Sequence, residues 1–197
     1  MLWRITSLGL TLGLALALAL PGSGSGLRGV QERIFDRLLP APPDNNITVI
    51  DIGAEDETGQ PWTRAATARL VARLAPHRPR AVGFDMLFAG DCDSKASDDL
   101  ARALQEVPAV LGFLLTDREA GGLPPSRLAV AGDVPLWPAP GADLPCPGFA
   151  QAEWAAMVLM GDGDATVRRV PVGVSVAGMP YPGLAVAVAA RADGGLP

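Results

Sequence analysis

The chain has 197 residues, of which 49% are hydrophobic and 19% are charged, and its formal net charge is −5. This composition excludes a disordered tail and suits one α/β domain with a substantial core. An acidic chain without a run of lysine and arginine also lacks the charge needed to bind phosphates, so we expect no nucleic-acid partner.

The N-terminal residues predict either a membrane anchor or a signal peptide. Arg4 precedes an uncharged run that extends from Ile5 to Leu27. About 20 uncharged residues suffice to span a bilayer, but a basic start and a short apolar centre are also typical of signal peptides. Both interpretations place residues 28–197, the expected main domain, outside the cytoplasm. If the run is a membrane anchor, residues 1–27 form it, and the membrane contact extends from Ile5 to Leu20.

The next part of the chain alternates apolar strands with amphipathic helices. In chain order the pattern predicts a helix at 27–39, a strand at 47–52, a helix at 63–74 with Thr63 as its N-cap, a strand at 81–88, a helix at 98–107 with Ser97 as its N-cap, and a strand at 109–115. Buried strands that alternate with helices indicate an α/β fold with a mostly parallel or mixed sheet and helices on both faces.

The C-terminal part carries weaker signals. Residues 117–147 are rich in glycine and proline and predict a long loop. We expect strands near 155–160 and at 167–176, a turn at 177–180 and a final apolar helix at 183–191. That helix is too short to span a membrane.

Two aspartates lie at or near the carboxyl ends of predicted parallel strands, where ligands bind in open α/β sheets. These are Asp51 and Asp85, and Arg64 follows Trp62 at the start of the first crossover helix. A guanidinium pairs well with a carboxylate or an anionic ligand, and a loop tryptophan makes a suitable pocket wall. The four residues therefore form a candidate ligand-binding site. The alternative is that the aspartates and Arg64 only fix loops of the fold.

The sequence contains no hydrolytic motif, so we assign no catalytic residue and expect no cofactor and no metal. A second function stays open, in which Asp51 and Asp85 hold a metal ion for hydrolysis outside the cytoplasm. Cys92 and Cys146 are either a disulfide or two buried thiols, because sequence spacing does not give their distance. They do not form a zinc site, since His77 is the one histidine in the chain.

Several short stretches, taken in order, resemble the second class of CHASE domain, the cyclase- and histidine-kinase-associated sensing extracellular domain. The stretches are Phe35-Asp36-Arg37-Leu38-Leu39-Pro40, Ile47-Thr48-Val49-Ile50-Asp51-Ile52, Gly59-Gln60-Pro61-Trp62-Thr63-Arg64, Ala81-Val82-Gly83-Phe84-Asp85-Met86-Leu87-Phe88, Asp98-Asp99-Leu100-Ala101, Asp162-Gly163-Asp164, Arg168-Arg169-Val170-Pro171 and Tyr181-Pro182. Gln60 departs from the family pattern, which has a tryptophan there.

The resemblance implies a periplasmic or extracellular sensor of a bacterial signal-transduction protein, and not an enzyme. It favours an uncleaved anchor over a signal peptide. Such domains precede a cyclase, kinase or phosphodiesterase domain, and the chain ends at Pro197 without one. It is then a fragment of a longer receptor or a sensor without its own output domain. We expect an unidentified small-molecule or protein stimulus, and a homodimer is compatible with the resemblance.

Overall fold

The computed structural model describes residues 34, 46–55, 59–119, 134–158, 167 and 170–194. Most of them belong to one compact unit, Ile50–Met160 with Arg169–Pro197, which holds every element named below. The predicted leader, the 27–39 helix apart from Ile34, and the matching stretch Asp162-Gly163-Asp164 lie outside the described residues. Among the helices that are described, none combines the length and apolarity needed to cross a bilayer.

A parallel sheet of three strands forms the centre of the unit. Strand β2 (Ala109–Thr116) pairs in parallel with β1 (Val82–Phe84) along one edge and with β5 (Glu153–Ala156) along the other. Strand β4 (Gly141–Asp143) pairs antiparallel with the last three residues of β2. The first five residues of β2 are all buried, as expected for a strand with neighbours on both edges and helices on both faces.

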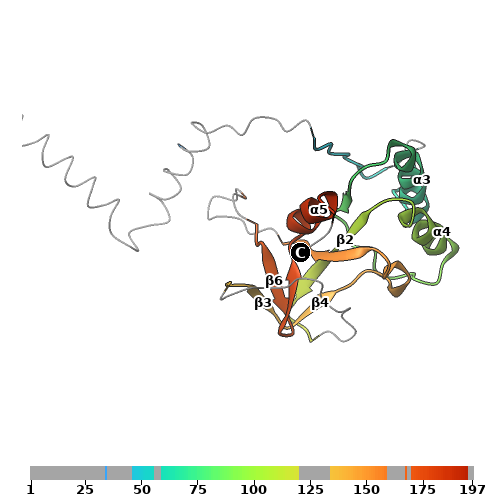
Figure 1. Ribbon diagram of the computed structural model, residues 1–197. Coiled ribbons are helices and arrows are strands. Elements are labelled where there is room, and N and C mark those ends of the chain that lie inside the picture. The colour runs from blue at the N-terminus through green and yellow to red at the C-terminus, as the bar shows by residue number, and fades with distance from the viewer. Residues whose placement is uncertain are drawn as a thin grey trace, which may run out of the picture. The chain divides into compact units, whose positions relative to one another are not determined.

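Helices cover both faces of this sheet (Figure 1). Helices α3 (Arg64–Leu74) and α4 (Lys95–Leu104) share a core with Leu111 of β2. Helix α5 (Leu184–Ala192) packs through Ala187 on the opposite face, against Val110. Successive residues of a strand point to opposite faces, so this alternation along β2 places the helices in two separate layers. Gly83 of β1 leaves room for α5, because an added Cβ would lie 2.5 Å from Val188 Cγ2.

A second sheet continues the fold beyond the end of β2. It contains β3 (Trp137–Ala139), β6 (Gly173–Val176) and β7 (Met179–Pro182). Strand β6 is parallel to β3 and antiparallel to β7, so the sheet is mixed. The rings of Phe113 and Tyr181 pack edge to face with their centroids 5.6 Å apart, and this contact joins the second sheet to β2. Burial raises the pKa of the Tyr181 hydroxyl.

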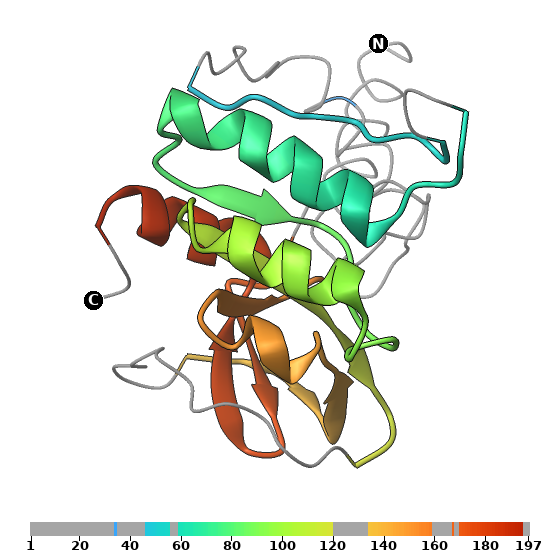
Figure 2. The same cartoon turned by 90° about the vertical axis from the view of Figure 1, so that its right-hand side faces the viewer.

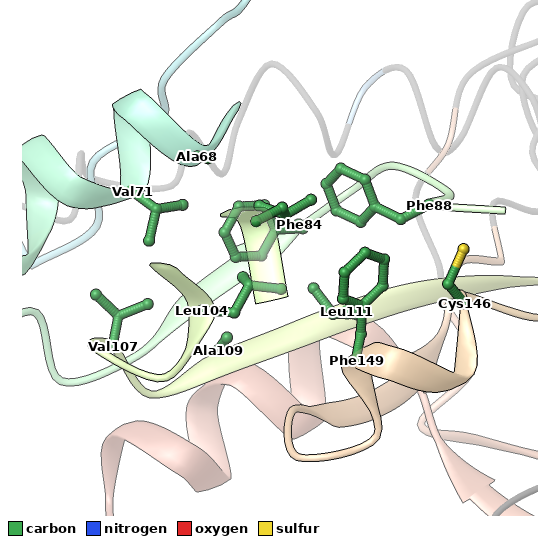
Figure 3. Close-up of a cluster of buried hydrophobic side chains, with 11 residues drawn as sticks. Ala68, Val71, Phe84, Phe88, Leu104, Val107, Ala109, Leu111, Cys146 and Phe149 are labelled. Carbon is green, nitrogen blue, oxygen red and sulfur yellow. The ribbon is translucent and has the colours of Figure 1, made fainter. Parts of the chain in front are cut away.

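The main core lies between the parallel sheet and the two helices α3 and α4 (Figure 3). Three phenylalanines run through it, with ring centroids 5.8 Å apart for Phe84 and Phe88 and 6.0 Å apart for Phe88 and Phe149. Both contacts are edge to face, the geometry that aromatic quadrupoles favour. Phe149 belongs to a short 3-10 helix, Pro147–Phe149, which directly follows Cys146.

Several predicted elements match the structure. Helix α3 begins where Thr63 predicts it, since the Thr63 side chain accepts a hydrogen bond from the N–H of Ala66. The structure also confirms the strand at 109–115, the helix at 183–191 and the presence of helices on both faces of the sheet. A 3-10 turn, Ala75–His77, ends α3. The predicted helix at 98–107 is shifted: α4 begins at Lys95, and its N-cap is Ser94 rather than Ser97.

The predicted strand at 47–52 is wrong for this structure. These residues form no strand, and Ile47, Val49 and Ile50 are 68%, 86% and 46% exposed. The strand at 81–88 shortens to β1, and the strand at 167–176 shortens to β6. Three short strands, β3, β4 and β7, fall where loops or a turn were predicted. Strands β3 and β4 depend on pairing with distant residues, which local patterns do not reveal, whereas β7 forms a hairpin with β6 around residues 177–178.

Candidate functional site

The N-terminus of α3 lies beside the loop that follows β1. Arg64 is the first residue of α3, and its guanidinium reaches across to the 89–94 loop. Nη1 donates to the carbonyl of Asp91 at 2.8 Å and to Ser97 Oγ at 3.2 Å. Nη2 donates to the carbonyls of Ala89, at 2.7 Å, and Gly90. One side chain therefore satisfies three consecutive backbone carbonyls.

The 89–94 loop needs this help because its backbone turns sharply. Gly90 and Asp91 have φ values of +67° and +43°, and the left-handed region is unfavourable for a residue with a side chain. The side chain of Arg64 is only 15% exposed, whereas the Asp91 carboxylate 4.0 Å away is 79% exposed. Hydrogen bonds to carbonyl oxygens, more than the ion pair with Asp91, therefore stabilise the half-buried charge of Arg64.

A disulfide between Cys92 and Cys146 closes the other side of the loop. The two Cα atoms are 5.4 Å apart, and the residues are separated by 54 positions in the sequence. The N–H of Cys146 donates to the carbonyl of Phe88 at 2.9 Å, so the backbone is tied at the same point. Arg64 Nη2 lies 3.8 Å from Cys146 Sγ, which places the charge next to the disulfide.

Two serines complete the cluster from α4. Ser94 Oγ caps the helix by accepting from the N–H of Ser97 at 3.2 Å, and Ser97 Oγ donates to the carbonyl of Asp91 at 2.7 Å. Ser97 is 3% exposed. Within the described residues, no buried side-chain nitrogen or oxygen lacks a hydrogen-bond partner. We call Arg64, the 89–94 loop, Ser97 and the disulfide the Arg64 cluster.

Trp62 lies next to this cluster but faces a different partner. Its indole Nε1 donates to Thr67 Oγ1 at 2.9 Å, and Thr67 Oγ1 in turn donates to the carbonyl of Thr63 at 3.2 Å. Thr67 is 2% exposed and Trp62 is half-buried. The tryptophan therefore braces the first turn of α3 and helps to set the direction of Arg64.

The two predicted aspartates lie apart from these contacts. Asp51 is exposed in an irregular segment, where its Oδ1 accepts from the N–H of Gly53 at 3.4 Å. Asp85 is exposed directly after β1. Among the residues that the structure describes, no ion pair joins Arg64 to either aspartate. The structure thus brings together Arg64 and the two cysteines, and gives Arg64 carbonyl partners in place of carboxylates.

A comparison with family models identifies the family of the chain. The model of the CHASE2 domain matches residues 10–195, nearly the whole chain. The chain belongs to the CHASE2 domain family. Its members are sensory domains of signalling proteins, which confirms the resemblance inferred from the sequence. No curated protein and no solved structure matches the chain.

The Arg64 guanidinium supplies the charged hydrogen-bond donors of the cluster in this CHASE2 domain. A guanidinium recognises carboxylates, phosphates and carbonyl oxygens through its planar set of donors. Across the described residues, no three His, Cys, Asp or Glu side chains gather closely enough to hold a metal ion. Asp51 and Asp85 therefore form no such group with a third ligand in this part of the chain.

Sequence reasoning missed the main partners of Arg64. Three of them are backbone carbonyls, and a carbonyl leaves no residue-specific signal in the sequence. The nearest available signal was the Gly90-Asp91 pair, which is typical of a turn with positive φ. Ser97 was singled out, but as a helix cap instead of a ligand of Arg64.

Proposed function

We propose that this CHASE2 domain is a membrane-anchored extracytoplasmic sensor of a bacterial signal-transduction protein. The observation that carries the proposal is the Cys92–Cys146 disulfide, which joins two loops at the base of the Arg64 cluster. Disulfides persist outside the cytoplasm and are rare inside it, where thiols are kept reduced. The uncharged run that starts at Ile5 supplies a means of export and anchoring.

A pair of reporter fusions tests this location. Alkaline phosphatase is active only after export, and green fluorescent protein fluoresces only when it folds inside the cell. Fused after Pro197, the phosphatase should be active and the fluorescent protein dark. Deleting residues 2–27 is the matched control and should reverse both signals. A fluorescent fusion with an inactive phosphatase for the intact chain would refute the proposal.

Membrane extraction then separates an anchor from a signal peptide. Carbonate washing releases soluble and peripheral proteins but leaves proteins with a membrane-spanning helix in the pellet. We expect the full chain in the pellet with Met1 to Leu20 still attached, as determined by mass spectrometry of the intact protein. Release into the supernatant after loss of those residues would show a cleaved signal peptide.

We place the stimulus contact at the Arg64 cluster, next to Trp62, and not at Asp51 and Asp85, which lie apart from its contacts. Arg64 holds the 89–94 loop through carbonyls, and a ligand with an anionic group competes for the same donors. Binding would release the loop from α3. A stimulus shifts the domain between two conformations only if it binds them with different affinity, and this competition provides that difference.

Thermal-shift measurements on the full chain test the site. A panel of carboxylates and phosphates is screened first, and each ligand that shifts the melting temperature is repeated on Arg64→Lys and on Arg80→Lys. Arg80 is exposed and pairs with exposed Asp193, so its variant controls for general charge effects. We expect the shift to disappear in Arg64→Lys alone. Equal shifts in both variants and the parent would place the ligand elsewhere.

A further inference from the structure

The two ends of the Cys92–Cys146 disulfide differ in exposure. Cys146 is 2% exposed, whereas Cys92 lies in the 89–94 loop and is only partly buried. An incoming thiolate must reach one of the two sulfur atoms to break a disulfide, so access favours attack at Cys92. The disulfide therefore has one accessible end and one buried end.

The buried end is fixed at the edge of the main core. The N–H of Cys146 donates to the carbonyl of Phe88 at 2.9 Å, and the carbonyl of Cys146 accepts from the N–H of Phe149 at 2.9 Å. Figure 3 shows Cys146 at the end of the group of core side chains, close to Phe88 and Phe149. Breaking the disulfide would therefore leave Cys146 in place, and the loop that carries Cys92 would be the part that moves.

The Arg64 guanidinium lies at the buried end of the disulfide. Figure 2 shows α3 and α4 side by side with their N-termini at the same end, which brings Arg64 to the loop between β1 and α4. Arg64 Nη2 is 3.8 Å from Cys146 Sγ, and the Arg64 side chain is 15% exposed. A cation stabilises a neighbouring thiolate, and the effect is larger where little water screens the charge. Cys146 is therefore the better leaving group of the two cysteines.

The charges beside Cys92 have the opposite sign. The Asp91 carboxylate is 79% exposed, and the exposed Asp93 directly follows Cys92. The nearby Lys95 pairs with Asp99 at 2.9 Å, which offsets its charge. Carboxylates at the point of attack repel an anionic thiol and attract a cationic one. The accessible end thus favours thiols that carry no negative charge.

We propose that Cys92–Cys146 is a thiol–disulfide exchange site whose substrate is a neutral or cationic thiol. The substrate thiolate attacks Cys92 Sγ, a new S–S bond forms there, and the bond to Cys146 breaks. Cys146 keeps the electron pair as a thiolate beside Arg64. A second substrate thiolate attacks the substrate sulfur of this mixed disulfide, which releases the oxidised substrate dimer, and Cys92 takes a proton from water. Two electrons pass from the two thiols to the two cysteines.

Reduction removes the disulfide and weakens a second tie of the 89–94 loop. The Cys146 thiolate competes with the carbonyls of Ala89 and Gly90 for Arg64 Nη2. The Gly90 carbonyl oxygen is 3.4 Å from Cys146 Sγ, so it is repelled by a negative sulfur. The exchange thus converts a chemical stimulus into movement of the loop between β1 and α4. The inference holds whether or not the location and the anionic ligand proposed above are correct.

Reduction rates of the full chain test the role of Arg64. Mercaptoethanol, a neutral thiol, is added in excess, and loss of the disulfide is followed by alkylation and mass spectrometry. We expect reduction to be roughly tenfold slower in Arg64→Gln than in the parent, and Arg64→Lys should recover most of the rate because it keeps the charge. If Arg64 only held the loop, its removal would make the disulfide easier to reduce. An equal or faster rate in Arg64→Gln would overturn the proposal.

The charge of the thiol gives a second test, on the unmodified full chain. Cysteamine is cationic, mercaptoethanol is neutral and mercaptoethanesulfonate is anionic, and each rate is divided by the rate of the same thiol with a small-molecule disulfide. At low salt the corrected rate should fall in that order, by at least about fivefold from the first thiol to the last. Asp93→Asn should reduce this difference, whereas Glu106→Gln, exposed beyond the far end of α4, should leave it unchanged. Corrected rates that are equal for the three thiols would contradict the proposed substrate class.

Discussion

Two segments are tied to the start of α3, and they are held in opposite ways. The 89–94 loop is polar and is fixed by Arg64 of α3, by Ser97 of α4 and by the disulfide. The 50–52 segment carries the apolar Ile50 and Ile52, and the residues that follow it are tied to the start of α3 by the backbone bond from Trp62 to Ala54 and by the bridge between Glu55 and Pro61. Both segments are largely exposed, although Ile50 and Ile52 have the stronger tendency to be buried.

The difference shows that polar contacts can order a loop more completely than apolar character orders a strand. Each carbonyl in the 89–94 loop needs a hydrogen-bond partner, and Arg64 offers several donors from one rigid group. An apolar segment becomes buried only when a neighbouring strand and a covering helix are both in place. Contacts in the loop can therefore be removed one at a time to measure how the ordering is divided among them.

Removing the disulfide should have the largest effect. The Cys92→Ala, Cys146→Ala double variant opens a link across 54 positions, and loop-closure entropy predicts a loss of about 4 kcal/mol in the free energy of unfolding. Urea unfolding of the full chain measures it. Adding a reductant should lower the stability of the parent to that of the variant and leave the variant unchanged. Equal urea midpoints for the parent and the variant would show that the disulfide does not order the loop.

Replacing Arg64 by lysine should have the next largest effect. Lysine keeps the charge, but its three donors on one nitrogen cannot replace two nitrogens that donate to four acceptors, namely the carbonyls of Ala89, Gly90 and Asp91 and Ser97 Oγ. We therefore expect a loss of roughly 2 kcal/mol in the free energy of unfolding. Arg80→Lys, which alters one exposed ion pair, should cost less than about 0.5 kcal/mol. Similar losses in the two variants would mean that the carbonyl contacts contribute little.

Trp62→Phe should have a smaller effect that stays local to α3. The variant loses the hydrogen bond from Nε1 to Thr67 Oγ1, and we expect a cost of about 1 kcal/mol. A double-mutant cycle with Thr67→Val isolates this contact, because the two losses should combine to less than their sum. Additive losses would place the contribution of Trp62 in packing alone.

The pH response of α4 should be the smallest effect and should leave the loop unaffected. The hydrogen bond from Lys95 holds the pKa of Asp99 below its ordinary value of 3.8, and the charges of Lys95 and Arg102 act in the same direction. A lowered pKa in the folded state gives stability above pH 3.8 that is lost as the pH falls further. An NMR titration of Lys95→Ala should show the pKa of Asp99 moving up. No movement would assign the shift to Arg102.

Local patterns were sufficient where an element is specified by its own residues. Thr63 caps α3 because its hydroxyl lies within three residues of the N–H that it accepts, and this relation is visible in the sequence. The apolar run of β2 likewise predicts that the strand is buried. Ser94 and Ser97 show the limit, since either serine is a suitable N-cap in the sequence and the structure uses Ser94 while Ser97 lies inside α4.

The sequence by itself determined that the chain has an α/β body with helices on both faces, and its short motifs, taken in order, identified the CHASE2 family. Tertiary structure alone decided the partners of Arg64, the short strands β3 and β4, and the exposure of the 50–52 segment. Capping and periodicity are relations between residues a few positions apart. Pairing with a backbone carbonyl or a strand edge depends instead on distances between remote parts of the chain.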